Sequence, residues 1–169
     1  LKYSDTVVIS APSGLALGGG FEVLVQSDYV VAHNNIVTGL VETLVGLIPA
    51  GGGTTNMLWR WMQTQEAKKD PDFAPQKVFD IIGYGKTASS PIEAIPFKFL
   101  LDKDKSIMNR NKLLSASQDL INEKKDGYKP PKQPTFKLSG SQVRDKMFQT
   151  LENLFKEKKI LEHGMEVGK

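Results

Sequence analysis

Three consecutive glycines between an apolar stretch and a second, longer apolar stretch constrain the fold of this chain more than any other feature. Gly18, Gly19 and Gly20 follow the apolar run 7–11 and precede the mostly apolar segment 21–25. This order predicts a strand, a tight glycine turn and then a helix. Because glycine lacks a Cβ, a ligand can approach the backbone of such a turn closely. The unpaired amides at the start of the helix could then hold an anion or a developing oxyanion.

Two glutamates lie beside glycine clusters in this part of the chain. Glu22 closes the first cluster, and Glu42 lies in the mostly apolar segment 38–54. A charged carboxylate in an apolar segment is costly unless it has a partner or a chemical task. Two carboxyl groups that share a small site can differ in protonation, so that one donates a proton and the other accepts one. The residues alone leave a second interpretation open, in which each glutamate is a solvated residue, as first-turn glutamates favoured by a helix dipole usually are.

Segment 14–54 resembles the crotonase family, whose best-known members are enoyl-CoA hydratases. The family pattern has glycines and an alanine before the first glutamate, an aspartate after the helix, and a second glutamate followed by glycines, a proline and a threonine. The matching positions of this chain are Gly14, Ala16, Gly18, Gly19, Gly20, Glu22, Asp28, Glu42, Gly46, Pro49, Gly52, Gly53 and Thr54. The resemblance implies an α/β fold, a crotonase-like ββα spiral, of which this chain would form the second half.

The resemblance also implies roles for particular residues. Gly19 would supply one backbone donor of the oxyanion hole that binds the thioester oxygen. Glu22 and Glu42 would hold a water molecule between them, Glu22 helping to activate it and Glu42 delivering a proton to the α-carbon. The implied reaction is the syn addition of water to a 2-enoyl-CoA. Further substrate contacts are implied for the backbone at Gly18, Gly20 and Ala50.

Two other functions stay open at this point. An enoyl-CoA isomerase would move the double bond without adding water, although the presence of both Glu22 and Glu42 favours a hydratase. A non-enzymatic alternative is an inactive assembly module, in which the glycines and helices serve only contacts between subunits. A product that gains water would distinguish a hydratase from an isomerase, and hydration that survives replacement of Glu22 and Glu42 would favour the assembly module.

Two later segments, 99–110 and 127–131, resemble a narrower group in which a crotonase portion is fused to a 3-hydroxyacyl-CoA dehydrogenase. This implies a multifunctional protein of fatty-acid β-oxidation. The chain is then expected to be a fragment, with an upstream half that supplies the other oxyanion donor and much of the CoA contact, and to form homo-oligomers. No cofactor is expected in this chain, because CoA is carried by the substrate and NAD would bind only in a dehydrogenase domain upstream.

Several other types of site are not supported by the sequence. The triplet 85–87, Gly-Lys-Thr, imitates the end of a P-loop, but the glycine that the motif requires is replaced by Asp80. The glycines of 14–20 do not fit the dinucleotide-binding pattern. His33 and His163 lack the spacing of metal ligands, so no metal site is expected. The sequence contains no recognisable nucleic-acid-binding module. Its net charge of +3 is also modest.

Composition and proline placement suggest the organisation and location of the chain. The sequence predicts a partial crotonase core with its following helices over 1–127, a proline-rich linker over 128–134 and a helical C-terminal extension over 135–169. The absence of cysteine mildly favours a reducing compartment, and the bacterial cytoplasm is preferred over the mitochondrial matrix. No apolar run approaches the roughly 20 residues that span a bilayer, so no stable membrane insertion is expected.

Helix signals add detail to this outline. Thr54 or Thr55 is expected to cap a helix through 57–62, and Ser139 or Ser141 one through 143–148. The second helix carries an apolar stripe that we expect to pack against another element or subunit. The stripe consists of Met147, Phe148, Leu151, Leu154 and Phe155.

Overall fold

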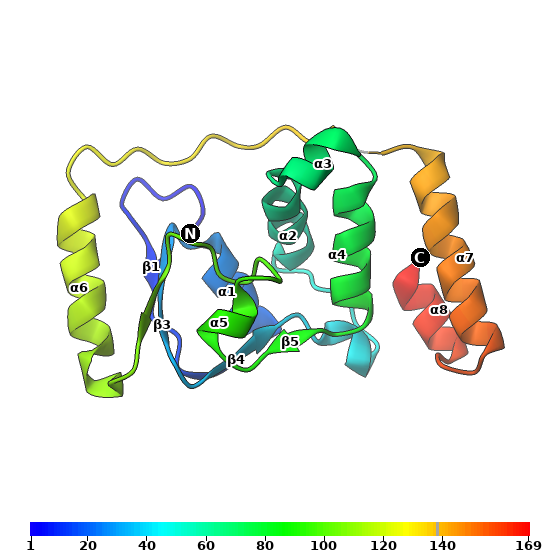
Figure 1. The fold of residues 1–169 in the computed structure, drawn as a ribbon, viewed down its shortest axis with the longest axis horizontal. Coiled ribbons are helices and arrows are strands. Elements are labelled where there is room, and N and C mark those ends of the chain that lie inside the picture. The colour runs from blue at the N-terminus through cyan, green and yellow to red at the C-terminus, as the bar shows by residue number, and fades with distance from the viewer. Residues whose placement is uncertain (138) are drawn as a thin grey trace.

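Two small three-stranded sheets form the centre of the protein in a computed structural model, which describes residues 1–137 and 139–169 (Figure 1). The first sheet is entirely parallel, with the order β1 (Ile9–Ser10), β3 (Tyr29–His33) and β6 (Lys105–Ile107). The second has the order β2 (Gly14–Leu17), β4 (Ile36–Gly39) and β5 (Thr87–Ala88), with β5 antiparallel to β4. Of the apolar run 7–11, where the sequence predicts a strand, only two residues form one.

Helices flank the sheets and continue beyond them toward the C-terminus (Figure 1). The helices of the main body are α1 (Gly19–Gln26), α2 (Gly53–Met62), α3 (Gln65–Lys69), α4 (Phe73–Gly83), α5 (Pro91–Ala94) and α6 (Leu113–Lys124). Two short 3₁₀ helices are η1 (Glu42–Val45) and η2 (Arg110–Lys112). The C-terminal pair consists of α7 (Ser141–Lys156) and α8 (Glu162–Gly168).

The main hydrophobic core lies between the sheets and helices α1, α2 and α4. Phe21 and Phe99 are fully buried, and their rings meet edge to face with centroids 4.9 Å apart. Met57 of α2 is also fully buried in this core. Burial of these side chains holds α1 firmly, and α1 is the helix that carries Glu22.

A buried arginine, Arg60, connects helix α2 to the segment before β6 through hydrogen bonds. Arg60 donates hydrogen bonds to the carbonyl oxygens of Lys98 (2.9 Å) and Phe99 (2.7 Å). Desolvation lowers the pKa of Arg60 to about 10, partly offset by the charge of Asp104. Burial raises the pKa of Asp104, whose carboxylate oxygens accept the amides of Val30 (2.9 Å) and Leu101 (2.8 Å). These contacts satisfy charged groups that would otherwise be costly to bury.

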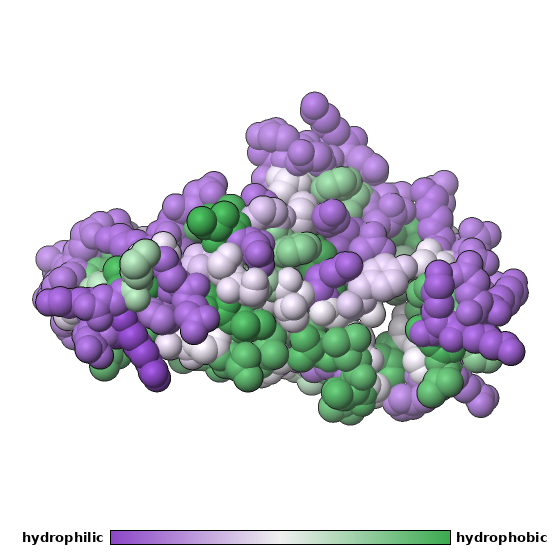
Figure 2. Space-filling model, turned by 60° about the horizontal axis from the view of Figure 1, so that its bottom comes forward, coloured by the Kyte–Doolittle hydropathy of each residue, from purple (hydrophilic) through white to green (hydrophobic). Residues whose placement is uncertain are grey.

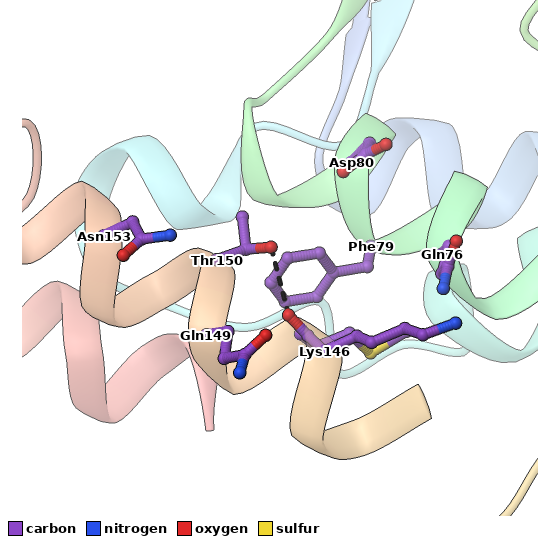
Figure 3. A pocket seen from close by; sticks show the side chains of 8 residues that line it. Gln76, Phe79, Asp80, Lys146, Gln149, Thr150 and Asn153 are labelled. Atoms are coloured by element: carbon purple, nitrogen blue, oxygen red, sulfur yellow. Dashed lines mark hydrogen bonds between the residues drawn. The ribbon is translucent and has the colours of Figure 1, made fainter. Parts of the chain in front are cut away.

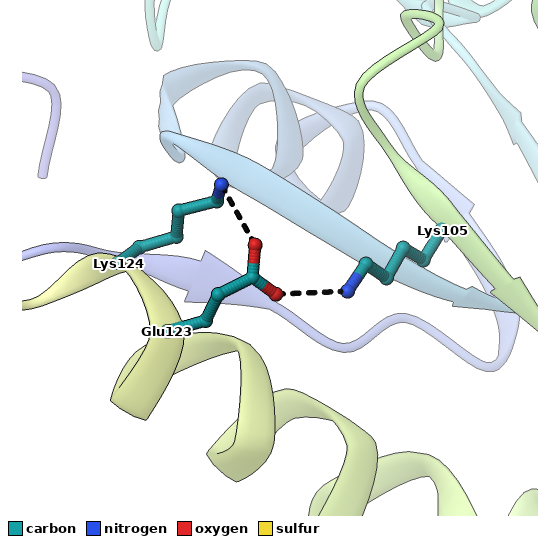
Figure 4. A network of polar contacts seen from close by, with 3 residues as sticks. All are labelled: Lys105, Glu123 and Lys124. Atoms are coloured by element: carbon teal, nitrogen blue, oxygen red, sulfur yellow. Dashed lines mark hydrogen bonds and ion pairs between the residues drawn. The ribbon is translucent and has the colours of Figure 1, made fainter.

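Helix α6 covers the parallel sheet through a smaller apolar cluster around Val31, Leu113 and Leu120. At its end, Glu123 forms ion pairs with Lys105 of β6 and with Lys124 (Figure 4). All three side chains are at least a third exposed, so this network contributes little to stability.

The C-terminal pair of helices returns to the main body after an irregular segment, 128–137 (Figure 1). Helix α7 packs against α4, and α8 packs against α7 and η1. The apolar stripe of α7 is only partly covered: Leu151 is buried, whereas Phe155 is 45% exposed. No helix in the described part of the chain is long and apolar enough to cross a membrane. The domain boundaries stay a prediction.

Three local expectations from the sequence are wrong. Segment 14–17, for which no strand was predicted, is strand β2, because it pairs with β4 along its whole length. Helix α2 begins at Gly53 after Gly52 in a left-handed conformation, φ 97°, without a side-chain cap from Thr54 or Thr55. Helix α7 follows Gly140 without a side-chain cap from either serine. Ser139 instead donates a hydrogen bond to the carbonyl of Pro71.

Candidate active site

The parallel pairing of β2 and β4 brings both glycine-flanked glutamates to one corner of the fold. Leu17 lies opposite Gly39 in the register, and the Gly18 amide donates to the Gly39 carbonyl at 3.0 Å. Beyond this edge β2 leads into α1, which carries Glu22, and β4 leads toward η1, which begins with Glu42. The two segments therefore leave the sheet side by side.

Glu22 is held in a buried position one turn into α1. Its side chain is 7% exposed, and its Oε1 accepts the amide of Gly53 at 2.9 Å. Its Oε2 lies against Gly51, where a Cβ would collide with the carboxylate. Gln26, one turn later on the same helix, donates to the Gly51 carbonyl. The glycine cluster 51–53 thus packs around the Glu22 carboxylate and donates a hydrogen bond to it.

Glu42 approaches the first glycine cluster from the other side. A Cβ built on Gly18 would lie 3.4 Å from Glu42 Oε1, so the carboxylate rests on the bare backbone of that turn. Its Oε2 is buried and has no hydrogen-bond partner among the described residues. A buried carboxylate oxygen without a hydrogen-bond donor is energetically unfavourable.

The turn that carries Glu42 is fixed at both ends. Thr43 Oγ1 donates to the Ile82 carbonyl of α4 at 2.8 Å. At the other end, Gly46 has φ 76°, and its carbonyl accepts Nε2–H of His163 from α8 at 2.8 Å. A Cβ at Gly46 would lie 2.8 Å from the His163 ring, so glycine is needed there for close packing as well as for its φ angle.

Backbone donors complete the corner. Gly19, Gly20 and Phe21 occupy the first turn of α1, where amides have no intrahelical acceptor. Gly19 and Gly20 are exposed, whereas Phe21 is fully buried. The structure therefore places the Glu42 carboxylate beside Gly18, at the start of the helix that carries Glu22 and the predicted amide donors. Ala50 directly precedes Gly51, which lies against the Glu22 carboxylate. Their catalytic and binding roles stay predictions.

Sequence reasoning did not single out several residues that shape the corner. Gly51 and Gln26 support Glu22, but their partners are 29 and 25 residues away in sequence and give no local signal. Thr38 is fully buried and donates to the Ala16 carbonyl at 3.0 Å, tying β4 to β2. His163, for which the sequence predicts no metal-binding role, packs against the turn of Glu42.

Two other features lie outside this corner. A polar groove of about 400 Å³ separates α4 from α7, with Gln76, Asp80 and Lys146 on its walls (Figure 3). Its lining residues include none of the glutamates or glycines described above. Within the described residues, no group of three or more His, Asp or Glu side chains is arranged to hold a metal ion.

Comparison with known proteins places these features in a family context. Residues 1–70 match the family model described as enoyl-CoA hydratase/isomerase. A probable 3-hydroxyacyl-CoA dehydrogenase of Bacillus subtilis is 31% identical over the whole chain, which covers 21% of that protein. A putative fatty acid oxidation complex trifunctional enzyme of Rickettsia felis is 41% identical over 66% of the chain, which covers 14% of that protein. The chain thus spans about a fifth or less of these relatives.

Solved structures agree with the family match. An enoyl-CoA hydratase subunit of Geobacillus kaustophilus is 25% identical, with a TM-score of 0.54, over 70% of this chain and 40% of that one. The arrangement of strands, helices and glycine corner is that of a crotonase-like α/β fold. Residues 1–70 of this chain belong to the enoyl-CoA hydratase/isomerase family, also called the crotonases.

Proposed function

We propose that this chain carries the acid–base half of an enoyl-CoA hydratase site, which adds water to 2-enoyl-CoA thioesters. The observation that carries the proposal is the convergence of Glu22 and Glu42 on the glycine corner, with Oε2 of Glu42 buried and unpartnered. In this proposal a water molecule binds between the two carboxylates and donates a hydrogen bond to Oε2 of Glu42.

The chemistry assigns a separate task to each group at the corner. The water oxygen bonds to the β-carbon while Glu22 accepts one of its protons, and Glu42 delivers a proton to the α-carbon. The electrons of the double bond pass through the thioester oxygen, where the Gly19 amide stabilises the transient negative charge. A proton passing back from Glu22 to Glu42 through solvent restores the starting state, and the net change is the addition of one water.

The hydratase would act within a longer multifunctional protein of fatty-acid oxidation. The similarity to dehydrogenase and trifunctional relatives supports this proposal. Hydration needs no cofactor beyond the CoA of the substrate, and NAD would bind in a different part of the parent protein. Partner contributions, including a second oxyanion donor and assembly into oligomers, belong to the same proposal.

An isotope experiment separates hydration from isomerisation. Incubation with crotonyl-CoA in heavy-oxygen water is expected to yield 3-hydroxybutyryl-CoA that carries the label at its hydroxyl group. Mass spectrometry of the product gives the label content, and a matched incubation with 3-enoyl-CoA reports any double-bond shift. Formation of unlabelled 2-enoyl-CoA from the second substrate, with no labelled alcohol from the first, would assign the chain to isomerases instead.

A further inference from the structure

Helix α1 carries two polar side chains, Glu22 and Gln26, and both bond to the same loop. They are four residues apart and therefore lie on one face of the helix, separated by one turn. The Gly53 amide donates to Oε1 of Glu22 at 2.9 Å, and Nε2 of Gln26 donates to the Gly51 carbonyl at 2.5 Å. The two side chains thus hold the two ends of the tripeptide 51–53.

A polar residue at position 26 is not needed to keep the surface of the protein polar. Val23, on the same helix, is apolar and 50% exposed. In Figure 2 hydrophobic surface also runs along the lower edge of the molecule. Because exposed apolar side chains are normal on this protein, exposure alone does not explain the glutamine or its hydrogen bond to Gly51.

The loop 51–53 has a backbone that needs outside contacts to keep one conformation, because all three of its residues are glycine. Gly52 has φ 97°, in the left-handed region. Glycine adopts positive and negative φ with similar ease, so the peptide between Gly51 and Gly52 can turn over at little cost. Gln26 bonds the Gly51 carbonyl and Asn56 bonds the Gly52 carbonyl at 2.8 Å, which together select one orientation.

The orientation of this peptide matters because Gly51 lies directly against Glu22. A Cβ at Gly51 would collide with Oε2 of Glu22, so the backbone of Gly51 is a close neighbour of the carboxylate. A carbonyl oxygen carries partial negative charge and would repel the carboxylate if it turned toward it. By holding the Gly51 carbonyl, Gln26 keeps the loop in the arrangement in which the Gly53 amide bonds to Glu22.

We propose that Gln26 is a positioning residue for the hydration reaction. Its side-chain amide holds the loop 51–53, and the loop holds the Glu22 carboxylate where it accepts a proton from the water. The inference rests on the proposed function, which gives Glu22 that task. Gln26 acts on the rate through Glu22 and not through a contact of its own with the reacting atoms.

Gln26→Met tests this role, because methionine has a similar length but no donor. It is expected to lower kcat for crotonyl-CoA about tenfold or more with little change in KM, since small displacements of a catalytic group are costly. Gln26→His keeps an N–H at a similar reach and should retain most of the rate. The matched control is Gln63→Met at the other end of α2, where Gln63 donates to the Trp59 carbonyl at 3.3 Å. This variant should leave kcat unchanged.

Two further readouts separate positioning from a general loss of structure. In the Glu22→Gln background, Gln26→Met should change kcat by less than about twofold, because its effect passes through the carboxylate. Hydrogen exchange of the Gly53 amide, followed by NMR, should be about fivefold faster in Gln26→Met than in the unmodified protein, as expected when a hydrogen-bonded loop is loosened. Gln63→Met should leave this exchange rate unchanged.

The outcomes distinguish this inference from the proposed function. Hydration that is lost in Glu22→Gln but retained in Gln26→Met would overturn the role of Gln26 and leave the proposed function standing. An equal fold loss from Gln26→Met with and without the Glu22 carboxylate, or unchanged exchange of the Gly53 amide, would overturn that role as well. Full activity in Glu22→Gln would overturn both proposals.

Discussion

Replacement of Glu42 by glutamine is expected to lower kcat for crotonyl-CoA hydration by about 10²–10⁴-fold with little change in KM. Glutamine keeps the size of the side chain but cannot deliver the proton to the α-carbon. The buried, unpartnered Oε2 of Glu42 indicates that the fold does not need this oxygen for its own hydrogen bonds. The loss should therefore appear in the rate, followed through the disappearance of the enoyl-thioester absorbance, and not in the stability.

Glu66→Gln is the control for this experiment, because Glu66 is exposed on α3 and lies outside the corner. It should leave both kinetic parameters unchanged. Wild-type rates in Glu42→Gln would remove Glu42 from the chemistry and favour the interpretation of the chain as an assembly module.

Gly51→Ala is expected to lower kcat by about 10²-fold, because small displacements of a catalytic group have effects of this size. A Cβ at Gly51 would occupy the place of Glu22 Oε2, so either the carboxylate or the loop must move. Steady-state kinetics measures the loss, and circular dichroism is expected to show unchanged helix content.

The matched control is Gly83→Ala at the end of α4, where a new Cβ would meet no atom within 4 Å. This variant should hydrate substrate at the normal rate. Equal activity in Gly51→Ala and the unmodified protein would mean that Glu22 does not need the observed position. It would contradict the claim that Gly51 positions the Glu22 carboxylate for catalysis.

The turn before the helix of Glu22 was predictable from the sequence because it depends on a local motif. The three glycines followed by Glu22 predict a turn and a helix start, and the structure has Gly18 at φ 53° directly before α1. The crotonase pattern then predicted that Glu42 belongs to the same site. The structure brings the two side chains to one corner through the parallel register of β2 and β4.

Features that depend on distant contacts were not predictable. Pairing with β4 makes segment 14–17 a strand although it contains Gly14 and Ala16, because tertiary pairing outweighs local propensity. His163 and Gly46 are 117 residues apart in the sequence, so no local pattern predicts their contact. The same holds for Gly51, whose role appears only when the Glu22 carboxylate is placed beside it.

The most direct test of the account compares Glu22→Gln, Glu42→Gln and the double variant in kcat/KM for crotonyl-CoA. If the two carboxylates act on one water, each single variant should lose most of the hydration, and the double variant should lose little more than the worse single one. Losses that simply multiply, or a single variant with the activity of the unmodified protein, would contradict a shared water held between Glu22 and Glu42.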